Sequence, residues 1–350
     1  MIEDPARTPI QTARLACLTQ SGLRWINALS LSLALFPGLL AGLQICSSRM
    51  LGRHPLTYVP IHTIVAMALI VSALNLGLAC RALAGTSLRP AVIWAILAVL
   101  IAAVGQGSAD TNVTGHPREA FFSHLAFLAT LAALVSVLGA RRPGETAWAI
   151  LCGLFIGIGL LPLMEGMALS KPFDILDRLR LDSPWNWFFL LVVFAGISNY
   201  IPTRHFKSSI CLALGLVVHL YMIWRPAGRA EWRGDFWWVL PWCISITVLM
   251  PAVWNTRGMR SNPADSFHDV WLPFRDAWGA AWALRVLERF NQASIKNQWP
   301  LRLQWFGLYP AENSTPEELA QFGPDQLLPT LLIFVRRFGD PDRIRRLDER

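Results

Sequence analysis

The strongest constraint on the fold is a series of continuous apolar runs, each close to the length that a helix needs to cross a bilayer. A bilayer core of about 30 Å requires roughly 20 mostly apolar residues in a helix. Such runs lie at about 25–46, 58–80, 91–107, 121–140, 147–168, 185–201, 208–224 and 236–254. Because the runs are continuous and not alternating, helices are the expected spanning form. We therefore predict an all-α polytopic membrane protein with about eight transmembrane helices.

The composition also favours a membrane protein. Charged residues make up 15% of the chain and apolar residues 54%, whereas an average soluble domain has about 25% charged residues. The 16 tryptophans fit long boundaries between water and lipid, because an indole ring buries an apolar body while its N–H stays near water. The net charge of +8 is explained by cations that face anionic lipid. The expected partner is therefore the lipid bilayer, and no nucleic acid is expected.

Polar stretches divide the chain into three parts. We expect an N-terminal cytoplasmic segment, a transmembrane bundle and a C-terminal cytoplasmic domain of α or α+β structure, at residues 1–24, 25–256 and 257–350. Lys and Arg are equally numerous in the two sets of alternate loops, and the arginines that follow the last run tip the balance toward the side of both termini. The predicted location is the plasma (inner) membrane, with both termini in the cytoplasm.

Polar side chains inside the apolar runs gather toward the membrane face opposite the termini. These residues are Gln44, His62, Gln106, His124, Glu165, Asn186 and His219. At a rise of about 1.5 Å per residue, the three histidines lie at matching depths, about 5 to 8 Å from the ends of their runs. The pattern predicts a polar layer at one depth of the bundle.

Three interpretations of this layer are open. In the first, its side chains contact lipid headgroups and water, where polar groups cost little free energy. In the second, two of His62, His124 and His219 hold a haem, because imidazole is a common axial ligand and helices at equal depth supply facing ligands. In the third, Glu165 is the centre of a metal-binding or proton-relaying site, with His116 in the loop above as a further metal ligand.

A helix that is too charged to span a membrane is expected at about 266–297. On a helical wheel one face of it carries Trp271, Arg275, Trp278, Trp282, Arg285 and Arg289. The carboxylates, including that of Asp276, point away from this face, which favours a helix at the membrane surface. The alternative is a soluble helix that packs its tryptophans on residues 301–309, which alternate weakly as in a strand. A further helix is expected from about 325 to 338.

No motif in the chain names a reaction. The signatures of serine hydrolases, zinc metalloproteases and nucleotide-binding loops are absent from the sequence. We therefore predict a non-enzymatic membrane subunit or scaffold that docks other membrane subunits or a cytoplasmic protein through residues 257–350. The first alternative is a haem- or metal-binding membrane redox or assembly protein that uses the histidine layer, and the second is a small-solute transporter.

Overall fold

The computed structural model describes residues 58–107, 117–140, 146–169, 183–224, 239–254, 267–311, 314–315, 322 and 324–340. The predicted N-terminal segment, the first apolar run and His116 therefore lie outside the described residues. Glu165 lies on a described helix, but its side chain is likewise outside the description.

Apolar helices occupy the predicted runs from the second to the eighth. They are α2 (Tyr58–Ala82), α3 (Arg89–Gly107), α4 (Pro117–Leu138), α5 (Thr146–Leu169), α6 (Ser183–Ser198), α7 (Phe206–Trp224) and α8 (Val239–Trp254). Within the described residues, 4 stretches are long and apolar enough to cross a membrane: His62–Arg81, Arg89–Gly107, Phe121–Leu138 and Phe206–Ile223. The described residues are thus mostly helical, as expected, and are compatible with a membrane protein, whereas the full count of eight spans stays a prediction.

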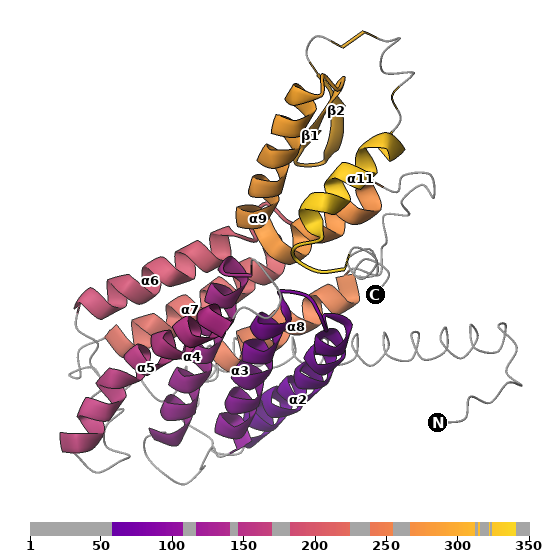
Figure 1. Cartoon of the computed structure of the whole chain (residues 1–350). Coiled ribbons are helices and arrows are strands. Elements are labelled where there is room, and N and C mark those ends of the chain that lie inside the picture. Colours follow the sequence, from indigo (N-terminus) through magenta and orange to yellow (C-terminus); the bar gives the residue numbers. More distant parts are fainter. Residues whose placement is uncertain are drawn as a thin grey trace, which may run out of the picture.

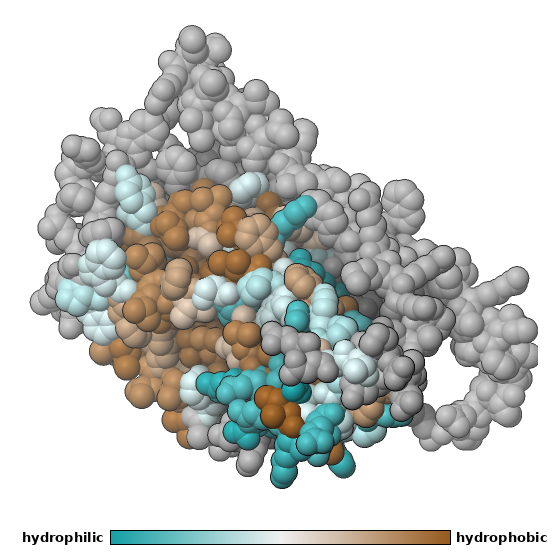
Figure 2. All heavy atoms as spheres, turned by 90° about the horizontal axis from the view of Figure 1, so that it is seen from above, coloured by the Kyte–Doolittle hydropathy of each residue, from teal (hydrophilic) through white to brown (hydrophobic). Residues whose placement is uncertain are grey.

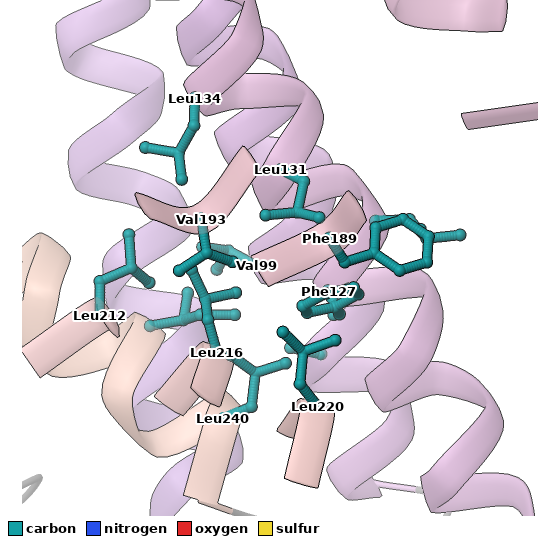
Figure 3. Close-up of a cluster of buried hydrophobic side chains, with 14 of the residues drawn as sticks. Val99, Phe127, Leu131, Leu134, Phe189, Val193, Leu212, Leu216, Leu220 and Leu240 are labelled. Carbon is teal, nitrogen blue, oxygen red and sulfur yellow. The ribbon is translucent and has the colours of Figure 1, made fainter. Parts of the chain in front are cut away.

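The helices pack side by side around an apolar core (Figure 1). Its centre contains Phe127, Leu131, Phe189, Leu216 and Leu220, which come from α4, α6 and α7 and lie close together in Figure 3. The α7 and α8 backbones approach closely at Gly215. A Cβ atom added to Gly215 would lie only 2.6 Å from Cβ of Cys243. Such small-residue contacts are a common way for helices to associate in membranes.

Large apolar side chains also cover the outside of the bundle. Examples between 62 and 71% exposed are Leu74, Leu154, Leu191 and Phe194. Figure 2 shows apolar residues gathered into a broad patch on one face of the molecule, with hydrophilic residues at one margin. Contiguous apolar surface of this kind is unusual in soluble monomers and is expected where a protein faces lipid.

The C-terminal elements sit on one end of the bundle, and we call the described residues 267–340 the cap (Figure 1). Its elements are helix α9 (His268–Lys296), strands β1 (Leu301–Gln304) and β2 (Gly307–Pro310), and helix α11 (Pro324–Val335). The strands form an antiparallel hairpin in which Leu303 lies opposite Leu308. The segment that alternates weakly in the sequence is therefore two short strands joined by a tight turn.

The cap has no separate core of its own, because its apolar side chains form one cluster with the end of the bundle. Leu88 at the start of α3 and Val137 at the end of α4 pack in the same cluster as Trp271, Trp278 and Phe338 of the cap. The turn between α6 and α7 contacts the cap as well, through Asn199 and Tyr200. The α2–α3 turn, the end of α4 and the α6–α7 turn thus share one end of the bundle with the cap, as alternating spans require.

Candidate functional site

A layer of buried polar side chains crosses the bundle near the end opposite the cap. Its members are between 0 and 6% exposed and are His62, Gln106, Ser123, His124, Asn186 and His219. They come from α2, α3, α4, α6 and α7. Neighbouring helices bury all six side chains, and their contact with lipid headgroups and water stays a prediction.

Helix packing fixes these residues at one depth. The rings of Phe127 on α4 and Phe189 on α6 meet edge to face with centroids 5.5 Å apart. Both helices run toward the cap, so one turn farther out lie Ser123 and His124 on α4 and Asn186 on α6. Asn186 is far from Ser123 and His124 in the sequence, but α4 and α6 bring all three residues to the same level.

Three members of the layer form a chain of close polar contacts. Oγ of Ser123 lies 3.2 Å from Nδ1 of His219, and Nε2 of His219 lies 3.4 Å from Nδ1 of His124. The other nitrogen of His124, Nε2, lies beside the backbone of Gly159 but makes no well-aligned hydrogen bond within the described residues. We call Ser123, His219 and His124 the Ser–His–His chain.

Stacked aromatic rings hold the two imidazoles of this chain. The ring of Phe127 stacks on His219 at a centroid distance of 4.8 Å and on His124 at 5.9 Å. His62 belongs to a second polar pair, in which its Nδ1–H donates to Oε1 of Gln106 at 2.7 Å. The structure therefore brings His124 and His219 together, while His62 is paired across the α2–α3 contact.

The layer is electrically neutral in its described part. The buried charged side chains in the described ranges are Arg275 and Asp276, and both belong to the cap. An apolar stretch of the core that includes Leu131, Leu134 and Val193 fills the bundle between the layer and the cap (Figure 3).

The haem expected at two of His62, His124 and His219 stays a prediction. The nitrogens of His124 and His219 are 3.4 Å apart, and their rings stack with centroids 5.7 Å apart. No group of three or more metal-binding side chains occurs among the described residues. The metal site at Glu165 and His116 stays a prediction.

At the junction of the cap with the bundle, helix α9 breaks at Gly279, where φ is 76° and ψ is −175°. The backbone carbonyl of Asn199 accepts the N–H of Ala280 at 2.7 Å, and its Oδ1 accepts the N–H of Ala281 at 2.8 Å. Its Nδ2 donates to the carbonyl of Trp278 at 3.3 Å. Asn199 thus satisfies three backbone groups that the break removes from the helical ladder.

The tryptophans predicted for the membrane surface face protein in the structure. Trp271, Trp278 and Trp282 are buried, and their indole N–H groups donate to the carbonyl of Trp305, the hydroxyl of Ser87 and the carbonyl of Val137, respectively. The three tryptophans therefore pack on protein, as in the alternative prediction. They contact the end of the bundle as well as the hairpin. An apolar face that is predicted from sequence buries its residues equally well in lipid or in protein.

The arginines of the predicted face divide into two groups. Arg275 is buried, whereas Arg285 and Arg289 are exposed, so contact with a membrane surface stays a prediction for these two. The helical wheel assumes one straight helix. Because α9 breaks at Gly279, angles on the wheel do not carry over from the first half of the helix to the second. The wheel also placed Asp276 wrongly. Its side chain is buried and does not point away from the packed face.

Buried charges at the junction form a small network around Asp276. Its Oδ1 lies 2.8 Å from Nη2 of Arg275, and its Oδ2 lies 3.4 Å from Nε of Arg204 in the α6–α7 turn. Nη1 of Arg275 also donates to the carbonyl of Trp305 at 3.0 Å. The network therefore links α9 to the bundle on one side and to the hairpin on the other.

His205 in the α6–α7 turn makes this junction sensitive to acid. Burial and the guanidinium of Arg204 together lower the pKa of His205 to about 4, against the opposing effect of the carboxylate of Asp276. The imidazole is therefore neutral in the folded protein at pH 7. Because its pKa is below the unfolded value of 6.5, protonation favours the unfolded or undocked state.

Stability should accordingly fall as the pH drops from about 6.5 to about 4, by at most about 3 kcal/mol from this residue. Thermal unfolding of the protein in detergent, measured across this range, tests the expectation against His205→Gln. The variant should lose less stability on acidification than the natural protein. Equal losses in the two proteins would show that His205 is not the sensitive group.

Sequence reasoning missed Ser123, Asn199 and Gly279 as structural or functional residues. Ser123 directly precedes a histidine in an apolar run, which is a weak signal that gains meaning only from the contact with His219. Gly279 is a glycine inside a helical pattern, a position that often marks a break. Asn199 closes an apolar run, and nothing in its neighbourhood indicates a partner 79 residues away.

Comparisons with known proteins place the chain in no group. No family model, no curated protein and no solved structure matches it. We therefore base the functional proposal on the geometry of the chain itself.

Proposed function

We propose that this protein is a multi-pass membrane protein that binds the uncharged polar region of a membrane lipid in its polar layer. The observation that supports this function best is the burial of six hydrogen-bonding side chains at one depth of an apolar bundle. Polar groups at membrane depth are expensive, and they commonly mark sites of binding or transport.

The chemistry of the layer favours a neutral ligand over an ion. Its described side chains are imidazoles, amides and a hydroxyl, and the buried charges lie in the cap. The N–H that a neutral imidazole carries on Nε2 of His124 would find an acceptor in an ester carbonyl or a hydroxyl.

The depth of the layer favours a lipid ester. The apolar stretch of α4 runs from Phe121 to Leu138, so Ser123 and His124 lie about 3 to 5 Å inside its outer end. The boundary between hydrocarbon and headgroups, where the ester groups of lipids lie, falls at this level of a bilayer. Exposed apolar side chains on the same helices would face the acyl chains.

Docking of other subunits or of a cytoplasmic protein through residues 257–350 stays a prediction. The cap uses much of its aromatic surface to pack on the bundle, since Trp271, Trp278 and Phe338 are fully buried there. The polar layer lies within the apolar bundle, where polar side chains commonly mark binding sites, and for that reason we base the proposed function on it.

Lipid binding can be measured by native mass spectrometry of the delipidated full-length protein. The probes are a short-chain phosphatidylcholine with ester linkages and its ether-linked analogue. We expect the ester lipid to bind more tightly, and we expect His219→Phe to weaken its binding about 10-fold or more through lost hydrogen bonds. Ser136→Ala is the matched control, because Ser136 is buried on α4 but lies about 20 Å from Ser123 along the helix. Equal binding of both lipids to both proteins would overturn the proposal.

A further inference from the structure

We infer that Ser123 is a nucleophile that takes the acyl group from a lipid ester, with His219 as its general base and His124 as the residue that positions His219. The inference rests on the proposed lipid site and assigns it a reaction. It starts from the three side chains of the Ser–His–His chain, which are buried and in contact across α4 and α7.

The geometry matches the general pattern of an activated serine. Such a site needs a hydroxyl within hydrogen-bonding distance of a base, and a third group that orients the base. The distance from Oγ of Ser123 to Nδ1 of His219 is 3.2 Å, and the distance from Nε2 of His219 to Nδ1 of His124 is 3.4 Å. Roles and distances define this arrangement, which recurs on unrelated folds in different chain orders.

One set of neutral tautomers satisfies the whole chain. With its proton on Nε2, His219 accepts the Ser123 hydroxyl proton at Nδ1 and donates from Nε2 to Nδ1 of His124. His124 then carries its own proton on Nε2, beside the backbone of Gly159. A neutral His219 with a free electron pair on Nδ1 is the form that can remove a proton from serine.

Rigid elements hold the three groups. Ser123 and His124 are neighbours on α4, and His219 lies on the facing helix α7. Phe127 stacks on both imidazoles and prevents them from turning away. Fixed positions of this kind supply much of the rate that intramolecular reactions gain.

The proposed step balances in atoms and charge. Oγ of Ser123 attacks the acyl carbon, and the hydroxyl proton moves to Nδ1 of His219. The tetrahedral intermediate collapses, the bond from the acyl carbon to the alcohol oxygen breaks, and that oxygen takes the proton back from His219. The products are acyl-Ser123 and the free hydroxyl lipid. Attack by water, or by another hydroxyl as co-reactant, then releases the acyl group by the reverse sequence.

The absence of a nucleophile-elbow motif agrees with this geometry. The motif serves a serine at a sharp turn between a strand and a helix, whereas Ser123 lies within α4. A nucleophile on a helix requires no glycines at fixed spacing. A sequence search for the motif therefore cannot find a site of this construction.

The test is covalent labelling of the full-length protein in lipid nanodiscs with an alkyl fluorophosphonate, followed by intact-mass analysis and peptide mapping. The serine oxygen displaces fluoride from phosphorus, so a labelled protein gains the phosphonyl group. We expect labelling at Ser123 and its loss in Ser123→Ala. His219→Phe should slow labelling by about 100-fold or more, which is the usual contribution of a general base. Ser136→Ala is the matched control and should label as the natural protein does.

Two variants of His124 separate positioning from packing. His124→Phe keeps a ring against Phe127 but removes the acceptor for His219, so labelling should fall. His124→Asn places an amide oxygen near the position of Nδ1 and should restore part of the rate. Unlabelled natural protein, or labelling that persists in Ser123→Ala, would overturn the assignment. If such protein still prefers the ester lipid in native mass spectrometry, the lipid site stands without the reaction.

Discussion

Replacing Gly279 with alanine is expected to undock the cap from the bundle and to raise amide exchange at Ala280 and Ala281. The φ of 76° and ψ of −175° at Gly279 define a conformation that is essentially restricted to glycine, and a side chain there costs about 1 to 3 kcal/mol. A Cβ at this position would also overlap the side-chain amide of Asn199, which must move and release its hydrogen bonds.

Together these effects should weaken docking by about 3 kcal/mol or more, which corresponds to roughly 100-fold faster exchange. Hydrogen–deuterium exchange of the peptide around Ala280, followed by mass spectrometry, measures the change directly. Gly157→Ala is the control, because a Cβ on that α5 residue meets nothing within 4 Å. Exchange at Ala280 that stays slow in Gly279→Ala would show that Asn199 does not hold the cap.

The helices of the bundle were the easiest part of the structure to predict from the sequence. Continuous apolar runs gave α2 to α8 with bounds that differ from the structure by only a few residues, as at α4, expected from 121 and observed from Pro117. The reason is that a run of some 20 apolar residues has few alternatives to a buried or lipid-facing helix. The depth of His62, His124 and His219 followed from their distances to the helix ends.

The surroundings of the predicted residues were harder to infer. The tryptophan face of α9 is real, but periodicity reports only that a face is apolar and cannot tell lipid from protein as its partner. The break at Gly279 depends on Asn199, which is 80 positions earlier in the chain, and no local pattern contains that contact. A wheel drawn through the break therefore placed Asp276 on the wrong side.

The Ser–His–His chain shows the same limit at the candidate site. His124 and His219 were singled out as ionisable groups in apolar runs, but Ser123 is an ordinary residue in a helix. Its role emerges from a contact with a residue 96 positions away. The depth of a residue in the bundle can be counted from the end of its helix. Which residue it faces depends on how the helices are rotated and ordered, and an apolar pattern alone does not determine this.

Replacing Asp276 with alanine should be the most damaging change of charge at the cap junction. Asp276 is 3% exposed and Arg275 is 7% exposed, so the variant leaves a buried guanidinium without its carboxylate. Removal of one partner from a buried ion pair costs about 3 to 5 kcal/mol, because the remaining charge is desolvated and unpaired. Thermal unfolding in detergent and exchange in the α9 peptides should both report this loss.

The exposed carboxylate of Glu288 supplies the control, since Glu288→Ala on the same helix should change stability by no more than about 0.5 kcal/mol. The double variant Arg275→Met, Asp276→Leu tests the cause. It removes both charges and keeps apolar volume, so it should recover most of the stability that Asp276→Ala loses. If the double variant is as unstable as the single one, shape at this position matters more than charge. Recovery of stability in the double variant would instead show that the ion pair orients the junction without adding net stability. The buried tryptophans and Asn199 would then be the groups that hold the cap on the bundle.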